Sequence, residues 1–256
     1  MTNEILNNRL RECGLSKEDL IKHIKMLDDN STVFVYSSHL EGLGTHNSDF
    51  DIYVIADRIQ ELENAVDLGR YTLSRAFLNG ITLDIEYWRT NDILNLILDI
   101  NSNNKNSKIK VEDLKLLHRL KIGQIIYGDE KGDKIRQAIK NSKLTENALG
   151  YYILEAGSLL EDSIALYKST EYECAYICAR NALFYAIGAY NVKCGVTNLR
   201  DKWIPKILAS INYDKEKVEI CLSYLIYSNV TRDSIAKETE ELINYINELL
   251  TTISIM

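Results

Sequence analysis

The spacing of apolar residues along the chain changes near residue 144. Before this point, short segments in which apolar and polar residues alternate are interleaved with segments in which apolar residues recur every three or four positions. After it, only the three- and four-residue spacing continues. The pattern predicts an α+β protein, with a small mixed β-sheet flanked by helices over residues 1–143 and an all-α helical bundle over residues 144–256.

Four strands are expected in the first domain. An apolar run at residues 33–36 and a second, alternating run at residues 49–55 lie on either side of a turn-rich loop that contains serine, glycine and threonine. Residues 81–88 (ITLDIEYW) alternate cleanly between apolar and polar positions, and residues 123–128 form a short apolar run suited to an edge strand. These segments are expected to pair in one small sheet.

Helical spacing predicts a long helix over residues 57–79, ending at Gly80, which is a common helix stop. Because this helix would lie between two strands, a right-handed crossover is expected to join them as neighbours. The polar stretch 101–108 (NSNNKNSK) is expected to be a surface loop, and residues 129–144 a transition between the domains. Further helices are predicted at residues 2–12, 16–29, 91–100 and 111–122, with Ser16 and Asp19 capping the second of them.

Five helices are expected in the bundle. One apolar stripe, formed by Leu149, Ile153, Ala156, Leu160 and Ile164, is expected to face its core. The helices are predicted at residues 145–168, 172–193, 199–210, 214–228 and 232–254, with breaks at Ser169, Gly195, Asn212 and Asn229.

Two aspartates share one face of the second predicted strand. Because side chains alternate along a strand, Asp49 and Asp51 point the same way. Two such carboxylates repel each other unless a cation lies between them, and oxygen ligands suit a hard ion such as Mg²⁺. If the strand at residues 81–88 is a neighbour, Asp84 can join the pair, with Glu86 as the alternative on the same face. Three carboxylates that hold two metal ions can activate a hydroxyl and bind a nucleoside triphosphate.

These residues resemble the nucleotidyltransferase superfamily typified by DNA polymerase beta. The shared pattern is a serine-bearing turn (Ser37 and Ser38), a glycine-containing loop, a Ser-Asp-x-Asp strand that starts at Ser48, and a later apolar-Asp-apolar strand. The aminoglycoside and lincosamide nucleotidyltransferases are nearest in layout. The family usually has glycine at the position of Ser37, which permits close approach of the backbone to phosphate or a positive φ.

The resemblance implies specific roles for these residues. Asp49, Asp51 and Asp84 would be the catalytic residues and metal ligands, with Asp84 or Glu86 as the third carboxylate. Ser37, Ser38 and Ser48 would bind the nucleotide phosphates, together with Lys202 of the helical domain. Other polar candidates near the acceptor are Glu171, Glu173, Asn198 and Arg200. The loop histidines His39 and His46 are expected to be solvated.

The helical domain resembles the carboxy-terminal half of the same antibiotic-modifying enzymes and the related HEPN domains. Many HEPN domains are ribonucleases that require an arginine followed four to six residues later by a histidine. No histidine follows Arg180, because the last histidine of the chain is His118. The ribonuclease base is therefore missing, and Arg180 is expected to be structural.

The implied function is Mg²⁺-dependent transfer of a nucleoside monophosphate, with AMP from ATP as the expected donor, two Mg²⁺ ions, and release of pyrophosphate. The expected acceptor is a hydroxyl of a small molecule such as an aminoglycoside-like antibiotic, which would make this an antibiotic-resistance enzyme. Two alternatives stay open: an antitoxin-type enzyme that AMPylates a protein, and a non-catalytic nucleotide-binding module, which is motivated by Ser37 at the glycine position.

Composition narrows the class of partner. The 256 residues include 37 acidic and 30 basic side chains, and the net charge of -7 argues against a nucleic-acid-binding protein. Neither a signal peptide nor a membrane span is expected. The five cysteines are odd in number and lack Cys-x-x-Cys spacing, as expected for free thiols in the cytoplasm. A homodimer is compatible with the sequence.

Overall fold

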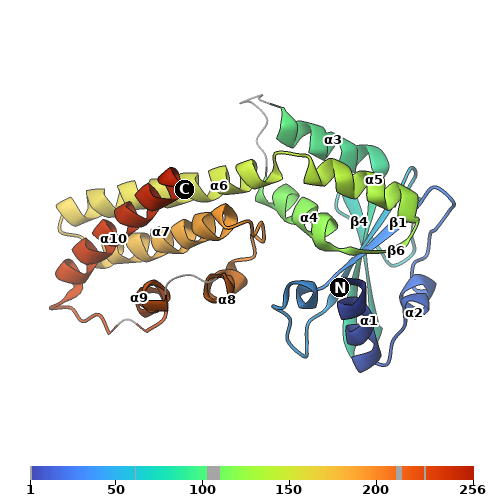
Figure 1. Ribbon diagram of the computed structural model, residues 1–256, viewed down its shortest axis with the longest axis horizontal. Helices are drawn as coiled ribbons and strands as arrows, with labels where there is room; N and C mark the ends of the chain where they lie inside the picture. The colour runs from blue at the N-terminus through green and yellow to red at the C-terminus, as the bar shows by residue number, and fades with distance from the viewer. Residues whose placement is uncertain (1, 61, 103–109, 212–214, 228) are drawn as a thin grey trace. The chain divides into compact units, whose positions relative to one another are not determined.

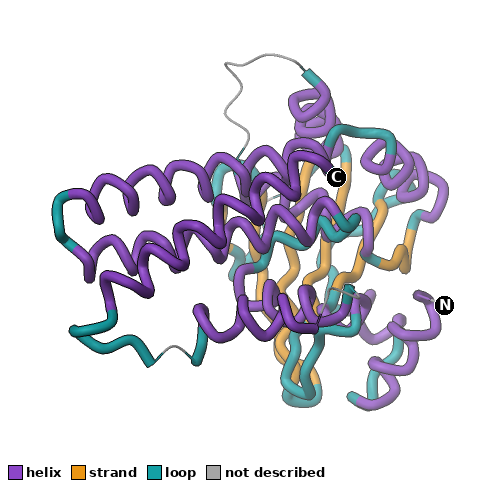
Figure 2. Tube along the Cα trace, turned by 60° about the vertical axis from the view of Figure 1, so that its left-hand side comes forward, coloured by secondary structure: helices purple, strands orange, loops and turns teal. Residues whose placement is uncertain are grey.

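The chain folds as two compact units, and the boundary between them in the sequence lies between Leu144 and Thr145. The computed structural model describes residues 2–60, 62–102, 110–211, 215–227 and 229–256. The first unit contains a mixed sheet with flanking helices, whereas the described part of the second unit contains helices and loops without strands (Figure 2). The predicted α+β fold class is therefore confirmed. Among the described residues, no helix is both long enough and apolar enough to cross a lipid bilayer.

The sheet of the first unit has six strands. The central strands β1 and β2 are buried along their whole lengths, which explains why their sequences are almost continuously apolar. Neighbours β2 and β5 are parallel, and the other pairs are antiparallel. In spatial order the strands are β3 (Val66–Asp67), β4 (Tyr71–Leu78), β5 (Ile81–Arg89), β2 (Phe50–Ala56), β1 (Thr32–Tyr36) and β6 (Gln124–Tyr127).

The helix predicted over residues 57–79 is wrong. The described part of this segment forms β3 and β4, and β4 pairs with β5 as a hairpin. Asn79 and Gly80 connect the two strands with φ values of 49° and 79°. Both positive φ values fit a type I′ turn, for which Asn-Gly is a preferred sequence. Gly80 is therefore a hairpin residue and not a helix stop, although β2 and β5 are parallel neighbours as expected.

The helices of the first unit follow the remaining predictions with two corrections. The second helix ends at Lys22 and not at residue 29, while its predicted capping box between Ser16 and Asp19 is present. Residues 129–140 form a helix where a transition was expected. The predicted polar loop lies mostly outside the described residues. The helices are α1 (Thr2–Glu12), α2 (Lys17–Lys22), the 3₁₀ helix η1 (Ser38–Glu41), α3 (Thr90–Asn101), α4 (Val111–Ile122) and α5 (Asp129–Lys140) (Figure 1).

One face of the sheet carries the candidate carboxylates. Residues that lie directly opposite each other on paired strands point to the same side. Tyr36 is opposite Asp51, and Asp51 is aligned with Asp84. Helix α4 packs on this side, because Arg119 donates a hydrogen bond to the Tyr53 hydroxyl. We call this side the aspartate face; it comprises Phe34, Tyr36, Asp51, Tyr53, Tyr71, Leu73, Arg75, Asp84, Glu86 and Trp88.

The second unit is built on three long helices, α6, α7 and α10, that run side by side (Figure 1). The predicted core stripe of α6 is only partly correct: Ala156 and Leu160 are buried, but Ile153 is 39% exposed. Tyr152 takes its place, packed so closely on Gly188 that a Cβ there would lie 2.4 Å from the tyrosine ring. The elements are α6 (Leu144–Lys168), α7 (Tyr172–Lys193), η2 (Asp201–Trp203), α8 (Ile204–Ser210), α9 (Lys215–Leu225) and α10 (Ile235–Ile255).

The breaks between these helices agree in part with the prediction. The chain turns after α6 at Ser169 and Thr170, and after α7 at Gly195, which has a φ of 95°. The segment predicted as one helix over residues 199–210 is instead a 3₁₀ turn followed by α8, with Pro205 in the first turn of α8. The predicted break at Asn212 lies outside the described residues.

Candidate active site

Three carboxylates converge where β2 begins and β5 passes beside it. Asp49 directly precedes β2, Asp51 lies in β2, and Asp84 lies in β5. One carboxylate oxygen from each lies within 4.8 Å of the other two. Asp51 is buried, whereas Asp49 and Asp84 are partly exposed. Oxygen donors at this separation fit a hard divalent cation, which would also relieve their mutual repulsion.

The cluster contains Asp84, and Glu86 lies two residues further along the same strand. The Trp88 indole N–H donates a hydrogen bond of 2.9 Å to Glu86 Oε2. Burial raises the pKa of Glu86 overall, although the hydrogen bond from Trp88 and the charge of Arg119 act in the opposite direction. Of the two alternatives, Asp84 therefore has the position expected of the third carboxylate. Its catalytic role stays a prediction.

Two arginines partly neutralise the cluster. Arg75 Nε lies 2.6 Å from Asp84 Oδ1, and Arg119 Nη1 lies 3.6 Å from Asp51 Oδ1. The hydrogen bond to Asp84 raises the pKa of Arg75. Arg75 lies in the segment that the sequence predicted as a helix, so the sequence did not predict its position opposite Asp84. Arg119 comes from α4, and its approach to β2 is a tertiary contact without a local sequence signal.

Arg119 also contacts Tyr53, which is the next residue of β2 after Asp51 on the aspartate face. Its Nη1 donates a hydrogen bond of 2.6 Å to the fully buried Tyr53 hydroxyl. Burial raises the pKa of Tyr53 well above its ordinary value, and the charge of Asp51 adds to this shift. Burial alone would lower the pKa of Arg119, but the interactions with Tyr53, Asp51 and Glu86 raise it overall. Tyr53 therefore stays neutral and Arg119 stays charged beside the cluster.

The serine-bearing loop runs from β1 through η1 to Asp49. Ser38 Oγ donates to Ser48 Oγ at 3.1 Å, and Ser48 Oγ accepts the Thr45 N–H at 2.9 Å. Ser37 has a φ of −149°, in the extended region that any residue adopts, so the turn does not need glycine there. Within the described residues, the buried Ser37 Oγ has no hydrogen-bond partner. A buried hydroxyl without a partner is unusual and marks a place where a polar ligand atom would be stabilised.

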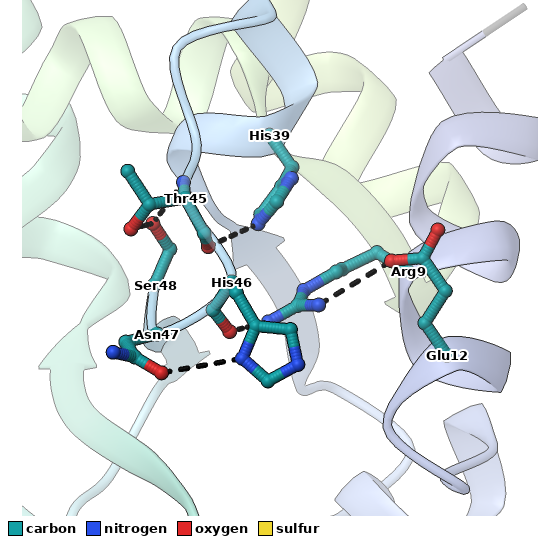
Figure 3. Close-up of polar contacts among 7 residues, drawn as sticks. All are labelled: Arg9, Glu12, His39, Thr45, His46, Asn47 and Ser48. Atoms are coloured by element: carbon teal, nitrogen blue, oxygen red, sulfur yellow. Dashed lines mark hydrogen bonds and ion pairs between the residues drawn. The ribbon is translucent and has the colours of Figure 1, made fainter.

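Two basic side chains hold the same loop through its backbone (Figure 3). His39 Nε2 lies 2.9 Å from the Thr45 carbonyl oxygen, so this histidine is more than a solvated loop residue. The buried Arg9 of α1 donates a hydrogen bond of 2.6 Å to the His46 carbonyl oxygen and pairs with Glu12. The sequence assigned no chemistry to α1, because nothing near Arg9 indicates a partner 37 residues away.

The second unit holds the remaining predicted residues. Lys202 is exposed in η2, with its ammonium group 5.0 Å from the centre of the Trp203 ring. The buried Asn198 accepts the Arg200 N–H through its side chain, and the partly buried Arg180 donates to the Leu225 carbonyl oxygen, as expected of a structural arginine. The proposed contact of Lys202 with a nucleotide stays a prediction.

Comparison with known proteins supports the interpretation at the level of fold. No protein-family model matches the chain, and no curated protein with which it was compared is significantly similar. A solved structure is similar: the crystal structure of a nucleotidyltransferase-like protein from Exiguobacterium sibiricum 255-15. The match covers 87% of this chain and 69% of that chain, with a TM-score of 0.50 and 14% identity.

The chain has a nucleotidyltransferase-like fold. At 14% identity the likeness concerns the fold and leaves substrate and acceptor open. It agrees with the predicted resemblance at the level of fold and does not test the antibiotic-modifying branch. Within this fold, the cluster of Asp49, Asp51 and Asp84 is the arrangement of side chains suited to divalent-metal chemistry.

Proposed function

We propose that the protein is a Mg²⁺-dependent nucleotidyltransferase that moves a nucleoside monophosphate, AMP from ATP, onto a hydroxyl of a small molecule and releases pyrophosphate. The convergence of Asp49, Asp51 and Asp84 on a nucleotidyltransferase-like fold is the observation that supports this proposal. These three carboxylates would hold Mg²⁺. The bound ions would neutralise phosphate charge and favour attack on the α-phosphorus.

In the proposed reaction, the acceptor hydroxyl oxygen forms a bond to the α-phosphorus while the bond from that phosphorus to the pyrophosphate oxygen breaks. Asp84 accepts the hydroxyl proton. Arg75 donates a hydrogen bond to Asp84 Oδ1 and thereby holds the orientation of this carboxylate. The negative charge that develops on the oxygen of the broken bond leaves with pyrophosphate.

The serine loop would bind the triphosphate. Ser38 and Ser48 already share a hydrogen bond, so their hydroxyls lie together beside Asp49. The buried Ser37 hydroxyl completes the proposed set within the first unit. Because Ser37 has an extended backbone, it occupies the position usually held by glycine without conformational strain.

Pyrophosphate release tests this function directly. Each of the four ribonucleoside triphosphates is incubated with Mg²⁺ and a panel of hydroxylated metabolites and antibiotics, including aminoglycosides. We expect release with ATP and at least one acceptor, and its loss in Asp51→Asn. The matched control is Asp99→Asn, an exposed aspartate on α3 of the same unit, which should retain full activity. Undiminished release by Asp51→Asn would refute the proposal, and label from ATP on protein would favour the AMPylating alternative.

A further inference from the structure

A pocket of about 250 Å³ opens on the aspartate face, where the amino-terminal part of α4 lies over β4 and β5. Glu86 lines this pocket two residues after Asp84, and both side chains point to the same side of β5. Two residues along a strand span about 7 Å, so the pocket begins within one small molecule's length of the carboxylate cluster. The residues used below are Tyr71, Glu86, Trp88, Asp113, Leu116 and Arg119.

Aromatic and apolar side chains form the walls of the pocket. Tyr71 and Trp88 lie opposite each other on β4 and β5, and their rings are stacked with centroids 4.7 Å apart and an interplanar angle of 15°. Leu116 of α4 is buried and adds an apolar surface. Such walls favour a compact ring over a flexible polar chain.

The charged side chains that line the pocket differ in how many ion pairs and hydrogen bonds they form. Arg70 forms an ion pair of 2.5 Å with Asp113, and Arg119 is held by Tyr53 and Asp51. The half-buried carboxylate of Glu86 accepts one hydrogen bond, from the Trp88 indole, and lies near the charge of Arg119 without an ion pair between the two among the described residues. Partial burial of a carboxylate that accepts a single hydrogen bond has a cost, and a ligand that donates further hydrogen bonds to Glu86 would reduce it.

We propose that this pocket binds the acceptor of the transfer reaction, and that the acceptor is a small ring-bearing molecule with an amino group that donates to Glu86. The ring lies along the Tyr71 and Trp88 wall, and a hydroxyl at its other end reaches Asp84. The role of the bound molecule as acceptor rests on the proposed function, whereas its binding to the pocket does not.

Fluorescence of Trp88 tests the binding. The chain has two tryptophans, so Trp203→Phe in the second unit leaves Trp88 as the reporter. In this background, the full chain is titrated with 2-phenylethylamine, 2-phenylethanol and phenylacetate, without nucleotide or divalent cation. We expect the amine to bind about tenfold more tightly than the alcohol, and the anion to bind most weakly.

Two variants in the same background separate the role of Glu86 from general attraction. Glu86→Gln should weaken amine binding about tenfold, to the level of the alcohol, and leave alcohol binding unchanged. Glu112→Gln removes the same charge at the exposed mouth of the pocket and should change amine binding less than about twofold. Equal binding of amine and alcohol, or equal effects of the two variants, would overturn the proposal.

A third variant keeps the test decisive if Glu86→Gln does not fold. Leu116→Phe narrows the pocket from α4 without touching Glu86, and calorimetry should show about tenfold weaker binding of all three probes. Unchanged binding in this variant would place the probes elsewhere and refute the pocket. Because these titrations contain no nucleotide, failure of the pocket and failure of nucleotidyl transfer are distinguishable.

Discussion

Arg75 and Asp84 lie directly opposite each other on β4 and β5, and Arg75 Nε donates a hydrogen bond of 2.6 Å to Asp84 Oδ1. The same carboxylate belongs to the cluster that would hold Mg²⁺. A divalent cation and the guanidinium group therefore compete for the negative charge of Asp84, and the arginine compensates that charge when the metal is absent.

Arg75→Gln should increase the affinity for Mg²⁺. The Arg75 side chain is 56% exposed, so solvent screens the pair and the expected gain is only about two- to fivefold. Isothermal titration calorimetry measures it, with Arg58→Gln as a control that removes an exposed charge from the same unit. Weaker Mg²⁺ binding would instead mean that Arg75 holds Asp84 in the orientation needed for coordination.

Asp49→Asn should stabilise the metal-free protein and abolish its stabilisation by Mg²⁺. Removing one of three clustered carboxylates reduces their repulsion, and we expect a rise in Tm of roughly one to three degrees without metal. Wild-type protein should gain Tm on addition of Mg²⁺ because the ion binds the folded state. Thermal denaturation with and without Mg²⁺ checks both statements, and a variant that still responds to Mg²⁺ would contradict the assignment of Asp49 as a ligand.

Glu86→Gln should stabilise the protein at neutral pH and have little effect at low pH. Burial raises the pKa of Glu86 in the folded state, so folding disfavours its ionised form. Below the unfolded pKa the residue is neutral in both states; as the pH rises through the folded pKa, the wild type loses stability that the neutral glutamine retains. Urea denaturation of both proteins at pH 4, 5.5 and 7.5 should show a difference that grows with pH. A constant difference would contradict the inferred burial.

Arg9→Met should loosen the serine loop without altering the sheet. The side chain of Arg9 is buried, and its hydrogen bond to the His46 carbonyl oxygen involves a charged donor, so its loss should cost about 1–3 kcal/mol of unfolding free energy. Faster amide hydrogen exchange should be confined to residues 44–48 and α1. Arg11→Met, an exposed change on the same helix, is the control and should leave both measurements unchanged. Unaltered exchange in Arg9→Met would refute this bracing role.

The strands that form the carboxylate cluster could be predicted because their alternation and their apolar runs are local properties. Asp51 and Asp84 follow from this pattern together with one assumption about which strands are neighbours. Strand β4 was missed, since the apolar residues Leu62, Val66 and Leu73 also fit helical spacing, although the Asn79 and Gly80 pair favours a hairpin.

The contacts that surround the cluster could not be predicted in the same way. Arg119 reaches Asp51 from a helix 68 positions away, and Arg9 reaches the serine loop from α1. Such contacts depend on how helices pack on the sheet, which periodicity does not encode. The sequence therefore predicted the acidic residues of the candidate site but not the arginines that contact the site and its loop.

The turn at Asn79 and Gly80 determines which residues of β4 lie opposite which residues of β5. This hairpin places Arg75 opposite Asp84 and Tyr71 opposite Trp88. Lengthening this turn by one residue would shift the register of β4 against β5, and both residue pairs would be lost together. The arginine beside the proposed metal site and the aromatic wall of the proposed pocket therefore depend on the same two-residue turn.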